Sequence, residues 1–302
     1  MISFIIPFYN EDGNLPILLD GIVKQMTKMR RDYEVIFVND GSTDDSISKL
    51  NERVISLNLK KDTVKILSHR KRIGKGKALI TGLNKLKGEI VIFMDGDNQD
   101  DPADLPKFIK KIDEGYDFVN GIRKNRQDNY LVKMYSNFVS KFLRTYMDSP
   151  FHDINCGFKA FKKVVLTDFA FYGNNFRFFP LTVFHGGFKV TEVEVNNKKR
   201  LYGVSKFGPN KLFIGIFDTL TAYFLFKFSE KPLHFFGSIG SVLFGLGSLI
   251  TIYLTFMRIF YHQMLYRRPM LLFGILLIIV GLQLGMTGII GELIVFLNKR
   301  KT

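Results

Sequence analysis

Two long runs without Asp, Glu, Lys or Arg lie in the last third of the chain. The first covers 26 residues (232–257) and the second covers 23 residues (269–291). Each exceeds the roughly 20 residues that an α-helix needs to cross the hydrocarbon core of a bilayer. Core helices of a soluble protein are the alternative, but they rarely remain apolar on every face over this length. The runs therefore predict a transmembrane hairpin over 232–298, with spans at about 232–257 and 269–296.

Small residues recur every four positions along both runs. Gly237, Ser241 and Gly245 share one face of the first predicted helix, and Gly281 and Gly285 share one face of the second. Small side chains allow the backbones of two membrane helices to approach closely. The pattern predicts close packing within the hairpin, or between two copies of the chain in a homo-oligomer.

The charges that flank the two runs are nearly balanced, so the positive-inside rule gives no clear orientation. Lys227 and Lys231 precede the first run and "NKRKT" follows the second, while the intervening loop carries three arginines. The first residues, "MISFIIPFYN", lack the charged segment of a signal peptide, and Pro7 interrupts their apolar run. We therefore expect an integral membrane protein whose large N-terminal region and two termini, including a basic tail at 299–302, are cytosolic.

A stretch of bulky apolar residues with scattered charges precedes the hairpin. It covers residues 211–231 and reads "KLFIGIFDTLTAYFLFKFSEK". This mixture is typical of a helix that lies in the plane of the membrane interface. An ordinary core helix is the alternative.

Residues 1 to about 210 alternate between strand-like and helix-like segments. The runs "ISFII", "YEVIFV", "TVKIL", "EIVIFM" and "YDFVN" are short and rich in β-branched and aromatic residues. Helical patterns such as "LPILLDGIVKQM" and "GKALITGLNKL" separate some of them. This alternation predicts a Rossmann-like α/β domain over 1–210, with an open, mainly parallel sheet covered by helices.

Polar segments follow the first four predicted strands: "PFYNEDGN", "NDGSTDDS", "SHRKRIGKGKA" and "DGDNQDDP". In open α/β sheets, ligands bind beyond the carboxyl ends of the strands. Turn formation alone would explain Asn, Asp and Gly at any one of these positions. Four such segments at one edge of a sheet favour a binding site.

The second and third of these segments offer contacts for a nucleotide. Asp40 can accept hydrogen bonds from a base or from ribose hydroxyls, and Gly41 permits a sharp turn of the backbone. The "GKGK" at residues 74–77 offers open backbone amides and two ammonium groups at the start of a helix, where a phosphate can bind. It is not a Walker loop, because the spacing and the Ser or Thr after the lysine are missing.

The fourth segment contains four aspartates within the ten residues "FMDGDNQDDP", which would repel one another without a cation. Asp95, Asp97 and Gln99 alternate along the chain, so in an extended conformation their oxygens project to one side. Such oxygens suit Mg²⁺ or Mn²⁺, which usually keeps phosphate oxygens and water as further ligands. The remaining acidic residues, Asp100, Asp101 and Asp104, are expected in the first turn of a helix beside Pro102.

The net charge of +15 points to an anionic partner, namely a phosphorylated ligand, an anionic membrane face or nucleic acid. A solvated basic surface is the alternative. Nucleic acid is disfavoured, because the basic residues are spread over loops and membrane flanks and do not form one stripe. The single cysteine, Cys156, excludes an internal disulfide and fits a reducing compartment.

The chain resembles the family 2 inverting glycosyltransferases that use polyprenyl phosphates, a group including dolichyl-phosphate mannosyltransferase and the bactoprenol glucosyl- and aminoarabinosyl-transferases. "IPFYNE", "VNDGSTDDS", "GKGKA", "MDGDNQDDP", "RLYGVSKF" and the C-terminal hairpin carry the resemblance, which spans essentially the whole sequence. The resemblance implies a UDP- or GDP-linked sugar donor, a polyprenyl phosphate acceptor and Mg²⁺ or Mn²⁺. Gly96 and Asn98 depart from the Ala and Leu of many members, which should loosen the metal loop.

The resemblance also implies roles for particular residues. Donor contacts are expected from Pro7, Tyr9, Asn10, Glu11, Asp40, Lys75, Asp95 and Lys206, and metal ligands from Asp97 and Gln99. The acceptor phosphate is expected to contact Arg123, Arg126, Lys133 and Ser136, and catalytic roles fall on Asp95, Asp97, Asp153 and Arg200. The alternatives are a solvated basic face for the acceptor residues, a turn or helix-cap aspartate for Asp153, and interfacial cations for Arg200 and Lys206.

The expected chemistry needs no strong general base, because a phosphate oxygen is already anionic near neutral pH. Positioning and neutralisation of the departing diphosphate should supply most of the rate. Two other classes of protein are the alternatives. A processive polysaccharide synthase uses a Gln-x-x-Arg-Trp motif, and this chain has no tryptophan. A non-catalytic membrane-anchored module that binds nucleotide sugars differs only in lacking turnover.

Overall fold

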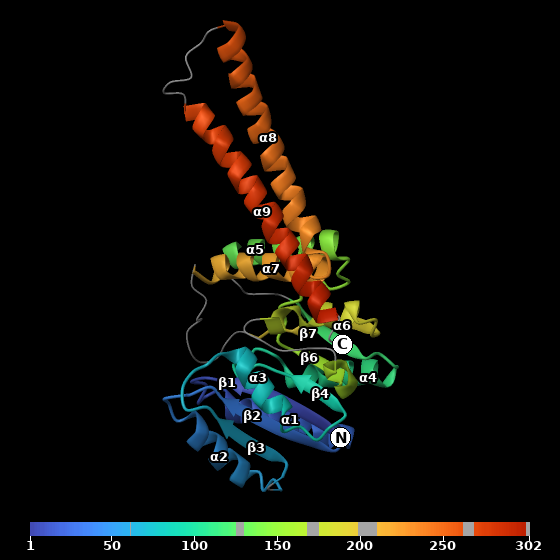
Figure 1. The fold of residues 1–302 in the computed structure, drawn as a ribbon. Coiled ribbons are helices and arrows are strands. Elements are labelled where there is room, and N and C mark those ends of the chain that lie inside the picture. The colour runs from blue at the N-terminus through green and yellow to red at the C-terminus, as the bar shows by residue number, and fades with distance from the viewer. Residues whose placement is uncertain (61, 125–129, 168–174, 199–209, 262–268, 300–302) are drawn as a thin grey trace. The chain divides into compact units, whose positions relative to one another are not determined.

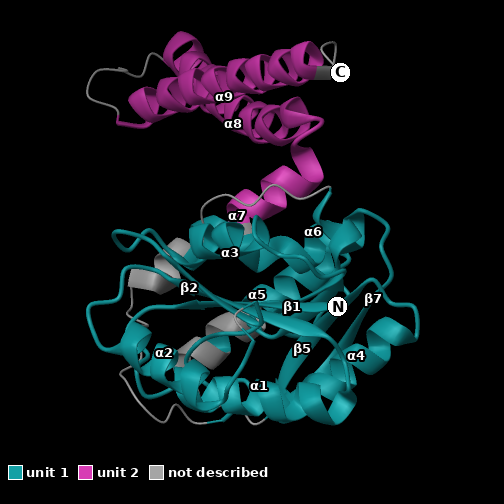
Figure 2. Ribbon diagram, turned by 90° about the horizontal axis from the view of Figure 1, so that it is seen from below, with its two compact units in different colours: residues 1–219 teal, residues 220–302 magenta. Residues whose placement is uncertain are grey.

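In the computed structural model, the described residues are 1–60, 62–124, 130–167, 175–198, 210–261 and 269–299. The chain divides into two compact units, residues 1–219 and residues 220–302 (Figure 2). The division falls inside one helix, α7 (Asn210–Phe228). The expected interfacial role of 211–231 and the expected domain limit at 210 stay predictions.

Within the described residues, seven strands form one sheet in the order β3-β2-β1-β4-β6-β5-β7. The strands are β1 (Ile2–Phe8), β2 (Tyr33–Asn39), β3 (Val64–Ser68), β4 (Ile90–Phe93), β5 (Phe118–Lys124), β6 (Lys159–Lys162) and β7 (Val190–Asn196). β6 runs antiparallel to β4 and β5, and the other pairs are parallel. The expected open, mainly parallel sheet is therefore confirmed.

Helices cover both faces of this sheet (Figure 1). The helices that belong wholly to the first unit are α1 (Leu15–Met29), α2 (Ser46–Ser56), α3 (Lys75–Leu83), α4 (Leu105–Asp113), α5 (Tyr130–Met147) and α6 (Phe179–His185), with short 3-10 helices η1 (Pro102–Asp104), η2 (Lys163–Leu166) and η3 (Asn175–Phe178). All seven residues of β1 are buried, as expected for a central strand covered on both faces.

The two faces have separate cores. On one face, Phe4 and Ile6 of β1 pack with Leu19 of α1 and Phe108 of α4. On the other face, four phenylalanines cluster between β4, β5, β6 and α6. The ring centroids of Phe93 and Phe161 are 4.9 Å apart, and those of Phe161 and Phe179 are 5.0 Å apart, both nearly perpendicular. These cores fix the strand ends at which the polar segments begin.

The second unit contains two helices, α8 (Pro232–Tyr261) and α9 (Pro269–Lys299). Among the described residues, these two are long and apolar enough to cross a membrane. They pack against each other closely, because a Cβ on Gly240 would lie 2.6 Å from the carbonyl oxygen of Gly281, and one on Gly247 would lie 2.6 Å from that of Gly274.

The small residues at this helix contact agree only in part with those expected. Gly281 and Gly285 lie at the contact, since a Cβ on Gly240 would lie 2.6 Å from the carbonyl oxygen of Gly281 and 3.1 Å from the amide nitrogen of Gly285. A Cβ on Gly245 would meet nothing within 4 Å, and one on Gly237 would meet only the Leu233 side chain. Gly237 and Gly245 therefore do not take part in close packing within the hairpin, because a four-residue spacing defines several faces of a helix, and packing between two copies stays a prediction for them. Which face meets α9 depends on how the two helices cross.

Candidate active site

An open pocket with an empty volume of about 580 Å³ lies at the carboxyl ends of β1, β2 and β4. β1 is the point at which the strand order reverses, since β2 lies on one side of it and β4 on the other. Ligands of doubly wound sheets bind at such a point. The lining residues are Pro7, Phe8, Tyr9, Glu11, Asp40, Arg72, Gly74, Lys75, Asp95, Gly96 and Asp97.

Asp40 lines the pocket and also supports its wall. Its carboxylate accepts hydrogen bonds from the backbone amides of Ile73 (2.9 Å) and Gly74 (2.8 Å), and its Oδ1 lies 3.0 Å from Nδ1 of His69. Gly41 adopts φ +76°, and a Cβ there would lie 2.6 Å from the amide nitrogen of Arg72, so the expected sharp turn is present. The amide of Gly74, expected to face a phosphate, is instead bonded to Asp40.

Tyr9 and Arg72 form one wall of the pocket. The guanidinium carbon of Arg72 lies 4.3 Å from the centroid of the Tyr9 ring, a cation–π contact. Arg72 was not among the expected donor residues. Its signal was the basic run "HRKR" after the third strand, but nothing in the sequence shows which of these cations faces the site.

Asn10 is one of the expected donor residues that does not line the pocket. Its side chain accepts a hydrogen bond from the amide of Thr43 (2.9 Å), and its own amide donates to the Ser42 hydroxyl (3.0 Å). Asn10 therefore ties the loop after β1 to the loop after β2. Glu11 lines the pocket, and its Oε2 accepts a hydrogen bond from Asn14 (2.7 Å).

Lys75 and Asp95 form an ion pair at the base of the pocket. Burial acts to raise the pKa of Asp95, but the charge and hydrogen bond of Lys75, with the charges of Lys159 and Arg123, outweigh it and hold the pKa below its usual value. Asp95 is therefore ionised near neutral pH. A bound diphosphate would compete for the Lys75 ammonium.

The loop after β4 keeps the expected alternation without the expected extended conformation. Asp95, Asp97 and Gln99 are half-exposed, while Gly96 and Asn98 between them are buried. The chain turns at 96–97, and Asn98 has the left-handed φ of 54° that Asn tolerates better than most residues. The expected extended segment is wrong for this part of the loop.

The two unusual residues of this loop have defined places. A Cβ on Gly96 would lie 2.8 Å from Cβ of Phe8, so the loop packs closely against β1. Asn98 is buried in its left-handed turn. Together they shape the loop, and the expected loosening stays a prediction.

The oxygen atoms of this loop fit a hard divalent cation. Asp100 is buried, and its Oδ2 has no hydrogen-bond partner. Burial, with the nearby charges of Asp95 and Asp97, raises the pKa of Asp100 to about 7. A cation held by Asp97 and Gln99 would relieve the repulsion among these carboxylates. No group of three His, Cys, Asp or Glu within the described residues could hold a metal, but Mg²⁺ typically takes one or two carboxylates plus phosphate oxygens.

The other acidic residues of the segment have structural partners. Asp101 caps η1 by accepting a hydrogen bond from the amide of Ala103 (3.0 Å), and Asp104 accepts one from the amide of Asn196 (2.7 Å). Both lie at the start of a helix, as expected. Asp100 lies before the helix, in a bridge with Asn197, so its expected place in the first turn was wrong.

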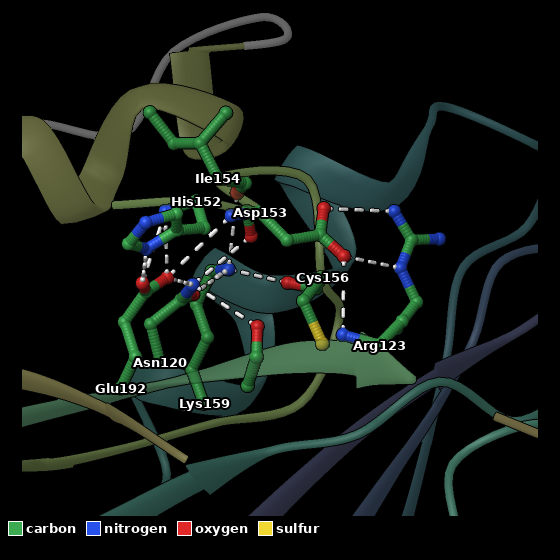
Figure 3. Close-up of polar contacts among 9 residues, drawn as sticks. Asn120, Arg123, His152, Asp153, Ile154, Cys156, Lys159 and Glu192 are labelled. Atoms are coloured by element: carbon green, nitrogen blue, oxygen red, sulfur yellow. Dashed lines mark hydrogen bonds and ion pairs between the residues drawn. The ribbon is translucent and has the colours of Figure 1, made fainter. Parts of the chain in front are cut away.

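Asp153 and Arg123 were expected to serve different parts of the site, but they form one ion pair (Figure 3). Nε of Arg123 donates to Oδ2 of Asp153 (2.7 Å) and Nη2 donates to Oδ1 (3.0 Å). The Asp153 side chain is 5% exposed and that of Arg123 is 18% exposed. This fork geometry binds a carboxylate strongly, so an acceptor phosphate would have to share Arg123 with Asp153.

A smaller cavity adjoins the pocket, and both are lined by Lys75 and Asp95. Cys156, Gly157, Lys159 and Arg177 also line it. Cys156 is buried and unpaired, and burial raises the pKa of its thiol to about 12, so it is not a reactive nucleophile.

The remaining expected residues cannot be placed. Arg126, Arg200 and Lys206 lie outside the described residues. Lys133 and Ser136 lie on α5, but their side chains lie outside the described part of the structure. Their expected roles stay predictions.

A pocket at the switch point of an open α/β sheet is the place where proteins of this fold class bind their ligands. Residues 3–198 match Glycosyl transferase family 2, so the chain belongs to this family and is a glycosyltransferase. The expected family is confirmed.

Two curated relatives match nearly the whole chain. The dodecaprenyl-phosphate galacturonate synthase of Rhizobium johnstonii is 29% identical over 297 residues, which cover 97% of this chain and 87% of the relative. The undecaprenyl-phosphate 4-deoxy-4-formamido-L-arabinose transferase of Proteus mirabilis is 29% identical over 294 residues, which cover 97% and 88%. Both alignments therefore reach into the C-terminal helices.

Solved structures with the same fold cover less of the chain. The glucosyl-3-phosphoglycerate synthase of Mycobacterium tuberculosis with Mg²⁺ and uridine diphosphate has a TM-score of 0.57 and 18% identity, covering 74% of this chain and 79% of that one. Its complex with Mn²⁺, uridine diphosphate and phosphoglyceric acid has a TM-score of 0.56 and 18% identity, covering 74% and 78%.

Proposed function

We propose that the protein transfers a sugar from a nucleoside-diphosphate donor to a membrane polyprenyl phosphate, with inversion at the anomeric carbon. The observation that carries this proposal is the match to two polyprenyl-phosphate sugar transferases over 97% of the chain, including the two apolar helices. Two apolar helices of this length would hold the catalytic unit at the membrane, where a lipid acceptor lies.

The donor nucleotide occupies the pocket at the ends of β1, β2 and β4. Tyr9 and Arg72 provide a flat surface for the base, and Asp40 holds the turn at residues 73–74 beside it. Lys75 shifts from Asp95 toward the diphosphate, which leaves the Asp95 carboxylate to accept hydrogen bonds from the donor. These assignments apply to a UDP- or a GDP-linked sugar.

Asp97 and Gln99 would hold Mg²⁺ or Mn²⁺ beside the diphosphate. When bound, the cation supplies positive charge that stabilises the departing nucleoside diphosphate. Lys75 adds to this charge from the protein, and Arg200 and Lys206 are proposed to do the same.

The acceptor phosphate approaches on the side of the Asp153–Arg123 pair. The phosphate oxygen is already anionic, so Asp153 serves to hold Arg123 in place and need not remove a proton. Arg123 can orient the phosphate, together with Arg126, Lys133 and Ser136. Holding the reacting atoms in line supplies much of the rate in such a reaction.

The protein would be an integral membrane protein with its catalytic unit and both termini in the cytosol, where nucleotide sugars are made. A homo-oligomer is compatible with the hairpin, because Gly237 and Gly245 do not face α9 closely.

The test presents purified protein, in nanodiscs containing undecaprenyl phosphate, with Mn²⁺ and a panel of radiolabelled UDP- and GDP-sugars. One sugar should enter the organic phase as a mild-acid-labile lipid, and omission of the lipid should abolish that product. Growth of a polymer would favour the polysaccharide synthase. Donor binding without turnover for every sugar and lipid tested would favour the non-catalytic module.

A further inference from the structure

Asp153 lies on a segment without regular secondary structure, yet its carboxylate is held in one place. Residues 152–157 lie between α5 and β6 and belong to no helix or strand. The pairing of Asp153 with Arg123 fixes only the side chain. The backbone of the segment must therefore be held by other groups, and Figure 3 shows them.

Asn120 of β5 and Glu192 of β7 hold the beginning of this segment. Nδ2 of Asn120 donates to the carbonyl oxygen of Asp153 (2.9 Å) and to Oε1 of Glu192 (3.1 Å). Glu192 in turn accepts from the backbone amide of His152 (2.9 Å to Oε2), and its Oε2 lies 2.8 Å from Nδ1 of the same histidine. Two adjacent strands thus bind the backbone on either side of Asp153.

Lys159 of β6 holds the end of the segment through hydrogen bonds to its backbone. Its Nζ donates to Oδ1 of Asn120 (2.8 Å), to the carbonyl oxygen of Ile154 (3.3 Å) and to that of Cys156. An ammonium group has three N–H donors, and each has an acceptor here. The residue is 5% exposed.

Lys159 is a buried charged group, so the fold must gain something from its presence that offsets the free-energy cost of burial. Moving a charged group from water into the protein interior costs free energy, and strongly perturbed groups cluster at functional sites. Burial lowers the pKa of Lys159 to about 8; Cys156 and the Asp153 carboxylate act to raise it, and the charges of Lys75 and Arg123 act to lower it. The charge of Lys159 also helps to keep Asp95 ionised.

The same segment contacts Asp95. A Cβ on Gly157 would lie 2.6 Å from Oδ2 of Asp95, so the backbone at 157 lies directly against that carboxylate. Movement of the segment would therefore displace Asp153 at one end and disturb Asp95 at the other.

We propose that Lys159 is a positioning residue for sugar transfer, which holds residues 152–157 so that Asp153 stays paired with Arg123 and Gly157 stays against Asp95. The inference rests on the proposed function, because it assigns the segment to the reaction centre. Lys159 itself touches neither substrate.

Three variants of Lys159 separate its charge from its hydrogen bonds. Lys159→Gln keeps two N–H donors without charge, Lys159→Met keeps neither, and Lys159→Arg keeps a charge that does not titrate. Lys162→Met is the matched control, because Lys162 lies on the same strand and pairs with Asp117 away from the site. All are compared with the wild type as full-length protein in nanodiscs.

Lys159→Gln and Lys159→Met should lower kcat by roughly tenfold to a hundredfold, since a displacement of about 1 Å can have an effect of that size. Calorimetric affinity for the nucleotide sugar with Mn²⁺ should fall much less than kcat, because Asp95 is the one donor-pocket residue that this segment is argued to contact, and Tyr9, Asp40 and Arg72 lie on other loops. Lys162→Met should behave as wild type.

Wild-type kcat should fall above about pH 8, where the Lys159 ammonium loses its proton. The Gln and Arg variants should lack this fall, and Arg should recover part of kcat.

Hydrogen exchange tests the inference without any transfer assay. Amides of residues 152–157 should exchange faster in Lys159→Gln than in the wild type, and Lys162→Met should leave them unchanged. Unchanged exchange in Lys159→Gln would overturn the inference, as would a wild-type kcat and pH profile in that variant. A loss of donor affinity equal to the loss of kcat would also overturn it. If the wild type forms no lipid-linked sugar, the proposed function fails, and the exchange result still decides whether Lys159 holds the segment.

Discussion

At the scale of single residues, cations of the site form ion pairs with carboxylates of the protein in the absence of substrate. Lys75 pairs with Asp95, and Arg123 pairs with Asp153. Each cation is therefore held in place by an anion, and substrate binding has to exchange one partner for another. Asp100 differs, because one oxygen of its buried carboxyl group has no hydrogen-bond partner.

The Arg123–Asp153 pair should show strong energetic coupling. Arg123→Ala would remove the guanidinium that pairs with the buried Asp153 carboxylate and should lower the free energy of unfolding by about 3 kcal/mol. The double variant Arg123→Ala/Asp153→Ala should be less destabilised than the sum of the single variants, with a coupling of roughly 1–3 kcal/mol. Chemical denaturation of the four proteins in detergent measures this cycle. Strict additivity would show that the two side chains do not interact in solution.

Removal of Asp97 should remove the metal site. Asp97→Ala should weaken Mn²⁺ binding in the presence of nucleoside diphosphate at least tenfold, because one of few protein ligands is lost. Electron paramagnetic resonance of free Mn²⁺ measures this affinity directly, and EDTA should abolish transfer by the wild type. Asp101→Asn is the matched control, since Asp101 caps η1 and contacts Lys198. Equal Mn²⁺ affinity in Asp97→Ala and the wild type would contradict this assignment.

At the scale of secondary-structure elements, a buried glutamate joins three segments of the sheet. Glu34 of β2 accepts hydrogen bonds from the Ser3 hydroxyl of β1 (2.7 Å), from Nζ of Lys65 on β3 (2.8 Å) and from the amide of Lys87 (2.5 Å). It lies at the amino ends of the strands, opposite the pocket. Glu34 therefore contributes to stability and not to catalysis, and its effect should appear in the pH dependence of the free energy of unfolding.

The contribution of Glu34 should disappear in acid. Burial acts to raise its pKa, but the hydrogen bonds from Lys65, Ser3 and Lys87 outweigh this, and the pKa lies below its ordinary value of 4.5. A lowered folded-state pKa means stabilisation that is fully present above pH 4.5 and lost as the pH falls through the folded-state value. The difference in unfolding free energy between wild type and Glu34→Gln should thus be constant from pH 5 to pH 7 and shrink below about pH 4.5. If the difference in unfolding free energy between the two proteins grew below pH 4.5, the lowered pKa of Glu34 would be contradicted.

The hairpin helices depend on glycine where they touch. Gly247→Leu should separate α8 and α9, because its Cβ would lie 2.6 Å from the Gly274 carbonyl oxygen, while Gly245→Leu should have little effect, since nothing lies within 4 Å of a Cβ there. Hydrogen exchange of residues 232–299 in nanodiscs should increase for the first variant and stay at the wild-type level for the second. The same increase in both would mean that the contact is not specific.

At the scale of the whole molecule, the orientation in the membrane determines which substrates the catalytic unit can reach. Nucleotide sugars are cytosolic, so the loop between α8 and α9 should face the opposite side of the membrane. The native Cys156 is buried, which makes the chain suitable for labelling at introduced cysteines.

Impermeant maleimide reagents should therefore distinguish the two sides. A cysteine introduced as Gln263→Cys, between the two hydrophobic runs, should react in intact cells. Cysteines introduced as Asn58→Cys or Thr302→Cys should react only after permeabilisation. Labelling of Asn58→Cys in sealed cells would reverse the proposed orientation.

The sequence by itself determined the features that depend on local pattern. Apolar runs of 26 and 23 residues predicted two long helices, and short β-rich runs predicted five strands of a mainly parallel sheet, because both patterns reflect burial along one element. The strand β6, "KAFK", was missed because four residues with two lysines carry no such pattern. The alternation in β7, "VTEVEVN", was present but not used.

Only the tertiary structure decided which side chains meet. Arg123 and Asp153 are 30 residues apart, and their pairing depends on the antiparallel insertion of β6 between β4 and β5. The same insertion places Lys159 beneath Asn120 and against the backbone of 152–157. A sequence shows that a lysine is present but not that it is buried, because burial is set by strand order and by the packing of distant elements. For the same reason, the spacing of small residues did not show which glycines of α8 face α9.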